Sequence, residues 1–93
     1  MSADRNKLHF IGAFGDFTNN DLESARNRII CDAPGAIPDL IESEEVTREL
    51  RKNNGFVAEL VLLSDPANFS MAEEVAAEAK EMGVEKVELI CCY

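Results

Sequence analysis

The sequence predicts a small α/β domain in which helices pack on a mostly parallel sheet of three to four strands. The near-continuous apolar run at residues 56–63 is typical of a strand that is covered on both faces, and a second strand is expected at residues 85–91. The segment between them, residues 71–82, is rich in alanine and other residues with high helix propensity. Two strands joined by one helix of this length are expected to be parallel, with a right-handed connection.

The first half of the chain predicts one further strand and two further helices. Residues 7–14 are nearly all apolar and too short for a helix, which indicates a buried strand. A helix is expected over residues 20–30, where apolar side chains recur at helical spacing. A second helix is expected to follow Ser43 as its N-cap and to run to Lys52. Acidic residues open this segment and basic residues close it, as the helix dipole favours.

Capping residues set the expected ends of two helices. Asn20 with Glu23, and Ser70 with Glu73, fit the capping-box pattern, in which the two side chains bond to each other's backbone. Gly83, just after the last helix, is typical of a left-handed cap.

Residues 36–41, which contain Pro38, leave two topologies open. The segment is either an edge strand, where proline is tolerated, or a simple crossover. If it pairs as a strand, a ferredoxin-like α+β fold with an inserted helix becomes the alternative to the parallel sheet.

Length and charge exclude several classes of protein. The chain of 93 residues is expected to form one domain, residues 1–93. Its net charge of −9, from 18 acidic and 9 basic residues, repels phosphate backbones and anionic lipid surfaces. No apolar run reaches the roughly 20 residues of a membrane span, and no signal peptide is recognised. We therefore expect a cytoplasmic protein that binds neither nucleic acid nor membranes and keeps its three cysteines reduced.

Polar residues follow two of the predicted strands at the point where each strand ends. Asp16 and Thr18 come after the first strand, and Asp65 and Asn68 come after the strand at 56–63. In open parallel sheets, ligands sit outside the carboxyl ends of the strands. If the two strands are neighbours, the two aspartates converge and could bind Mg²⁺ or share acid–base chemistry. The alternative is that these residues only shape turns and helix starts, for which aspartate is well suited.

Three other features carry weaker chemical signals. Gly12 and Gly15 resemble a phosphate-binding turn, but the third glycine and the Lys-Ser/Thr pair are missing, so a turn or a close backbone approach is preferred. His9, the only histidine, lies within a strand and is interpreted as a structural or interface residue. Adjacent Cys91 and Cys92 form no CxxC pair and point to opposite faces of a strand, so one of them is expected in the core.

Glu59 and Glu88 each interrupt a predicted strand. A carboxylate on a buried strand needs a partner or exposure to solvent. Either one face of the sheet is partly open, or an acidic face meets a basic partner. That partner includes another copy of the chain, through Arg26, Arg28 or Arg48.

These observations favour a non-enzymatic, acidic, self-associating module that binds or regulates a protein, for which a basic partner is suited. A homodimer or higher oligomer is expected, because a small sheet leaves apolar edges that are normally covered. Two alternatives stay open. One is a small ligand- or metal-binding domain or enzyme that uses Asp16 and Asp65, and the other is an acidic inhibitor that mimics DNA in a basic groove. Apart from the divalent metal named above, no cofactor is expected.

Overall fold

The computed structural model, which describes residues 8–53 and 57–92, contains one sheet of four parallel strands. The strands are β1 (Leu8–Phe14), β2 (Asp39–Glu42), β3 (Val57–Ser64) and β4 (Lys86–Cys91), in the order β2-β1-β3-β4. The α/β prediction, including the parallel pairing of the last two strands, is confirmed. The ferredoxin-like alternative is wrong, because that fold needs antiparallel neighbours.

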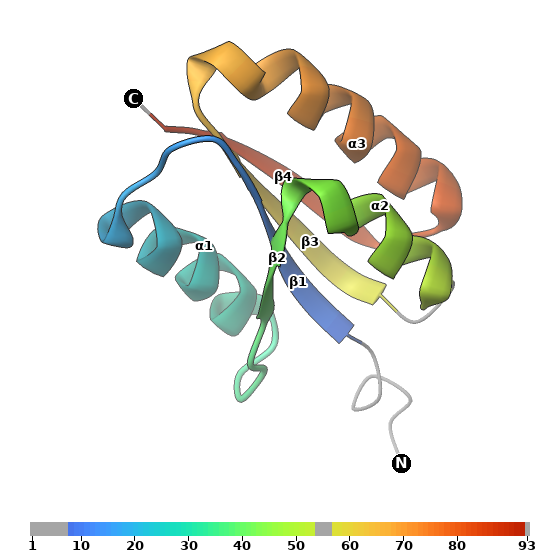
Figure 1. The fold of residues 1–93 in the computed structure, drawn as a ribbon. Helices are drawn as coiled ribbons and strands as arrows, with labels where there is room; N and C mark the ends of the chain where they lie inside the picture. Colours follow the sequence, from blue (N-terminus) through green and yellow to red (C-terminus); the bar gives the residue numbers. More distant parts are fainter. Residues whose placement is uncertain (1–7, 54–56, 93) are drawn as a thin grey trace.

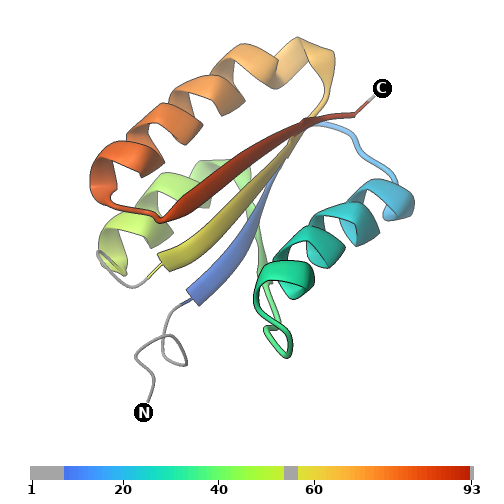
Figure 2. The same ribbon diagram turned by 180° about the vertical axis from the view of Figure 1, so that it is seen from behind.

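Three helices cover the sheet on both faces. They are α1 (Asn19–Asp32), α2 (Ser43–Lys52) and α3 (Phe69–Met82), and a short 3₁₀ helix, η2 (Pro66–Asn68), leads into α3. Helix α1 lies on one face, and α2 and α3 lie side by side on the other (Figures 1 and 2). This division follows from the strand order: the chain moves one way from β1 to β2 and the other way afterwards. Right-handed connections then place the helices on opposite faces.

Strand β2 is the edge strand that residues 36–41 allowed. It begins at Asp39, immediately after Pro38, and pairs in parallel with β1, with Ile11 beside Leu40. Because proline lacks the N–H that a ladder needs, it stands at the start of the strand and not within it.

Helix α1 begins earlier than the sequence indicated. Its N-cap is Thr18, not Asn20, and its capping box is formed with Asp21, not Glu23. The Thr18 hydroxyl oxygen accepts the Asp21 N–H at 3.2 Å, and an Asp21 carboxylate oxygen accepts the Thr18 N–H at 2.9 Å. A threonine and an acidic residue three positions apart satisfy the same pattern two residues upstream, so the local motif alone was ambiguous.

Helices α2 and α3 also start differently from the prediction. The N-cap of α2 is Glu42, the last residue of β2, so Ser43 is already helical. Helix α3 begins at Phe69, which places Ser70 inside its first turn, and no side chain caps it. The turn starts earlier because Asp65 caps the preceding η2, whose first residue is a proline with a helix-compatible φ. The carboxyl end of α3 is confirmed: Gly83 adopts a left-handed conformation with φ +102°.

The core has two layers, one on each face of the sheet. The larger layer joins the sheet to α2 and α3, and its fully buried side chains include Phe14, Val46, Leu60, Leu62, Ala72 and Ala79. The smaller layer, under α1, contains Ile11, Ala25, Ile29, Val61 and Leu63. Side chains of successive residues in a strand alternate between these layers, as a sheet covered on both faces requires.

Among the described residues, no helix combines the length and the apolar character needed to cross a bilayer.

Candidate functional site

The carboxyl ends of β1 and β3 lie next to each other at the centre of the sheet. The chain leaves β1 toward α1 on one face and leaves β3 toward α3 on the other (Figure 1). This is the point at which the strand order reverses, where ligands bind in many open α/β sheets. The fold therefore brings together the two loops that carry Asp16 and Asp65.

Asp65 connects the two loops through hydrogen bonds that its carboxylate accepts. Oδ2 accepts the backbone N–H of Asp16 at 3.1 Å. Oδ1 accepts the backbone N–H of Asn68 at 3.0 Å and its side-chain amide at 2.8 Å. These hydrogen bonds hold the pKa of Asp65 below its usual range, and the bond from the Asp16 N–H has the largest effect. Both oxygens therefore serve the two turns, as the structural alternative predicted.

Gly15 makes this connection sterically possible. Its φ is +80°, in the left-handed region that favours glycine, and a Cβ built there would lie 2.3 Å from Asp65 Oδ2. Gly12 is required for a different reason, since a Cβ there would lie 2.6 Å from Leu62 Cδ2 and 3.0 Å from Val46 Cγ2. Gly15 thus allows a turn, and Gly12 allows α2 to pack closely on the sheet. Both roles agree with the interpretation that the sequence analysis preferred over a phosphate-binding turn.

The other predicted site residues do not join into one ligand sphere. Thr18 uses its hydroxyl and its N–H at the start of α1, away from Asp65. The Asp16 carboxylate is exposed, and only the backbone of this residue reaches Asp65. Within residues 8–53 and 57–92, no group of three His, Cys, Asp or Glu side chains could hold a metal ion. The Mg²⁺ hypothesis therefore rests on two aspartates, and the carboxylate of one of them, Asp65, already accepts hydrogen bonds with both oxygens.

A second group of polar residues lies near the opposite end of the strands, on the face covered by α1. His9 of β1 is paired with Glu59 of β3, and Glu59 is paired with Lys86 of β4, so the three side chains share one face. The last turns of α1 add Arg28 and Asp32. We call His9, Arg28, Asp32, Glu59, Lys86 and Glu88 the charged cluster.

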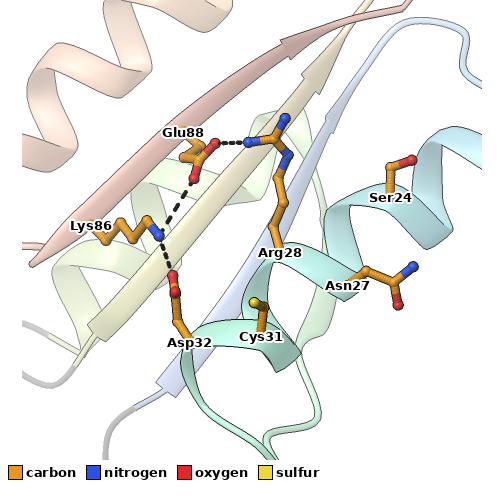
Figure 3. A pocket seen from close by; sticks show the side chains of 7 residues that line it. All are labelled: Ser24, Asn27, Arg28, Cys31, Asp32, Lys86 and Glu88. Carbon is orange, nitrogen blue, oxygen red and sulfur yellow. Dashed lines mark hydrogen bonds and ion pairs between the residues drawn. The ribbon is translucent and has the colours of Figure 1, made fainter.

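Lys86 is the centre of the charged cluster. Its ammonium group pairs with Asp32 and lies 3.6 Å from a Glu88 oxygen and 3.9 Å from Glu59 Oε2. Arg28 pairs with Glu88, so two cations from different elements hold α1 against β4 (Figure 3). Two surface pockets, of about 480 and 420 Å³, are both lined in part by Asp32 and Lys86. Arg28, one of the three arginines that the sequence offered to another copy, is therefore used within the chain.

Glu59 is the least expected member of the charged cluster, because it is only 3% exposed. Its Oε2 and the Nδ1 of His9 are buried without a hydrogen-bond partner in the described part of the chain, and Nδ1 lies 3.6 Å from Glu59 Oε1. Burial, and then the Asp32 carboxylate, raise the pKa of Glu59 to about 7, although Lys86 opposes the change. Burial lowers the pKa of His9. The predicted open face is thus wrong for Glu59.

The prediction that one of the adjacent cysteines, Cys91 and Cys92, lies in the core is confirmed. Cys92 is buried in the layer under α1, Cys91 is half-buried and Cys31 is exposed, and all three are free thiols. Burial raises the pKa of Cys92, which disfavours the thiolate that a nucleophile would need.

A third surface is the open side of β4. It includes a groove of about 290 Å³ between β4 and α3. Val87, Leu89, Ile90 and Cys91 are all half-buried on this strand, and among the described strands β4 has β3 as its one neighbour. No known protein family, curated protein or solved structure matches the chain, so these three surfaces are the basis for any functional proposal.

Proposed function

We propose that this chain is a non-enzymatic protein-binding module that self-associates through the open edge of β4. The observation that carries the proposal is that β4 combines half-buried apolar side chains on both faces with a backbone edge that no other described strand pairs with. An edge strand with these properties is a template for pairing with another strand. The net charge of −9 favours a basic surface on any further protein partner.

The other sheet edge is better protected against pairing. Strand β2 has only four residues, begins after Pro38 and carries exposed charges at Asp39 and Glu42. Short length, proline and charge are the features by which natural sheets block edge pairing. Leu40 is nevertheless 50% exposed on β2, which makes it the natural site for a control substitution.

The enzyme alternative has less support at the carboxyl ends of the strands. Asp65 accepts hydrogen bonds with both oxygens, and Thr18 is committed to the start of α1. Of the two aspartates, Asp16 alone has a carboxylate that accepts no hydrogen bond from the described residues. A binding surface made of strand edge and apolar side chains needs none of these groups.

Sedimentation equilibrium tests the proposal with the same substitution on both edges. The wild type is expected to sediment above its monomer mass of 10.3 kDa at micromolar concentration. Leu89→Lys on β4 is expected to return it to the monomer, because a charged side chain on an edge strand opposes pairing. Leu40→Lys on β2 is expected to leave association unchanged.

Circular dichroism and thermal unfolding establish that both lysine variants fold. A wild type that remains monomeric over the whole concentration range contradicts the proposal. Loss of association in Leu40→Lys, with Leu89→Lys unaffected, would instead place the contact at β2.

A further inference from the structure

The groove beside β4 is lined by one stripe of α3. Glu73, Ala76, Ala77 and Lys80 line it from the helix, and Val87, Glu88 and Leu89 line it from the strand. The helix residues are spaced by three, one and three positions, so they lie on one face of α3. Neither Glu73 nor Lys80 forms an ion pair within the residues that the structure describes.

This stripe is complementary to itself when it is reversed. If α3 of a second copy packed antiparallel to it, Glu73 would face Lys80 of that copy, and Ala76 would face Ala77. Lys80 would likewise face Glu73, so the same opposite-charge pair would form twice. The two alanines would let the helix backbones approach closely, since their side chains are small. Such a pattern suits an isologous contact, in which one patch meets its own copy.

The backbone of β4 is compatible with the same symmetry. The N–H of Cys92 donates to the Ser64 carbonyl of β3 at 2.7 Å. Because alternate residues of a parallel strand bond to opposite sides, the backbone groups of Val87, Leu89 and Cys91 point away from β3. These three residues have the spacing needed to bond an antiparallel strand.

A two-fold axis at Leu89 uses all three of these residues and places no like charges opposite each other. If the two-fold axis passes at Leu89, Leu89 lies opposite itself, Val87 lies opposite Cys91, and Glu88 lies opposite Ile90. If the axis passes at Glu88, two glutamates face each other, which is unfavourable between directly opposite residues. The stripe on α3 is centred between Ala76 and Ala77 and lines the same groove as Val87, Glu88 and Leu89, so an axis at this level of β4 could also relate the two α3 helices.

We propose that the occupant of the β4–α3 edge is a second copy of this chain, related by a two-fold axis at Leu89. In this dimer, β4 pairs antiparallel with its copy, α3 packs on its copy, and Glu73 forms ion pairs with Lys80 in both directions. The inference rests on the proposed self-association through β4, and it adds the partner, the orientation and the residues that specify them.

Charge reversal tests the arrangement. Glu73→Lys alone and Lys80→Glu alone each create two like-charge pairs in a homodimer, so each is expected to weaken association roughly tenfold. An equimolar mixture of the two variants is expected to recover wild-type affinity as a heterodimer, because both pairs are then of opposite charge. The double variant is expected to recover the homodimer. Glu74→Lys and Lys52→Glu, which make the same charge changes at exposed positions outside the groove, are the matched controls.

Disulfide cross-linking tests the register independently. With Cys31 and Cys91 changed to serine, Leu89→Cys is expected to form an intermolecular disulfide in a glutathione redox buffer. Directly opposite hydrogen-bonded residues have Cα atoms about 5.5 Å apart, within the range of a disulfide. Glu88→Cys in the same background is expected to cross-link far less.

The outcomes separate this inference from the function on which it rests. Association that persists in the wild type but is not recovered in the Glu73→Lys and Lys80→Glu mixture overturns the arrangement and leaves self-association through β4 intact. Stronger cross-linking of Glu88→Cys than of Leu89→Cys overturns the register. A monomeric wild type overturns both proposals.

Discussion

The carboxylate of Asp65 accepts the backbone N–H of Asp16 at 3.1 Å, across 49 positions of sequence. This bond joins the loop after β1 to the loop after β3 at the centre of the sheet. Asp65 takes part through its side chain, and Asp16 takes part through its backbone.

Asp65→Asn is expected to lower the melting temperature. If the asparagine amide oxygen keeps the bond from Asn68, its NH₂ group faces the Asp16 N–H, and two donors cannot bond. Because the pKa of Asp65 is held below its ordinary value of 3.8, the stabilisation is present above that pH. It is lost as the pH falls through the lower folded-state value. Thermal unfolding between pH 2 and 7 measures the difference between the two proteins.

The same pair of proteins tests the Mg²⁺ alternative. We expect Mg²⁺ to change the melting temperature of neither protein, because both Asp65 oxygens already accept hydrogen bonds. Saturable stabilisation of the wild type that disappears in folded Asp65→Asn would show a metal site at the carboxyl ends of the strands.

Gly12→Ala is expected to destabilise the fold by about 1–3 kcal/mol, the usual cost of overpacking. The added Cβ would lie 2.6 Å from Leu62 Cδ2 and 3.0 Å from Val46 Cγ2, which forces α2 away from the sheet. Chemical denaturation measures the free energy of unfolding. In the Leu62→Val background, which removes the nearest atom, the cost of Gly12→Ala is expected to be smaller. Equal costs in both backgrounds would contradict the packing explanation.

Glu59→Gln is expected to remove a pH dependence of stability. The folded-state pKa of Glu59, about 7, lies above its ordinary value of 4.5. Its contribution is therefore fully present below pH 4.5 and is lost as the pH rises through 7. Well above pH 7, glutamine is expected to be the more stable residue by on the order of 3 kcal/mol, since it stays neutral. Urea unfolding of both proteins at pH 5 and pH 8 gives the comparison.

His9 requires a control in the same experiment. Its lowered pKa opposes the effect of Glu59, because a buried neutral histidine destabilises the fold as the pH falls through 6.5. The comparison is therefore repeated in the His9→Asn background. Asp32 and Lys86 titrate outside this window, since the pKa of Asp32 is lowered from 3.8 and that of Lys86 is raised from 10.5. A pH dependence that is unchanged in Glu59→Gln, in both backgrounds, would show that Glu59 is ionised throughout.

Duplex DNA is expected not to bind at physiological salt. A chain of net charge −9 gains nothing from counterion release. The charge of Arg28, one of its arginines, is moreover paired with Glu88. A gel-shift titration at several salt concentrations is the measurement. A shift that weakens as salt increases would contradict the electrostatic argument.

The strands were predictable because strands buried on both faces are almost continuously apolar, as Val57–Ser64 illustrates. The helix starts were harder to predict. Thr18 and Asn20 both precede by three positions an acidic residue that could complete a capping box, and only the path of the chain selects Thr18. The convergence of Asp16 and Asp65 depended on strand order, which local patterns do not contain. The charged cluster depended on register: nothing near Glu59 in the sequence indicates that His9 and Lys86 occupy the same level of the sheet.

The position of β1 between β2 and β3 has a consequence for how the chain acquires its structure as it is synthesised. Once residues 8–53 have emerged from the ribosome, β1 can pair with β2 and pack against α1, but its other side still lacks β3. Ile11 is paired with Val61 in the sheet, so its pairing on that side is completed only after Val61 has been synthesised. Pairings this distant in sequence slow folding, and the unfinished β1 edge is the segment most exposed to wrong pairing meanwhile.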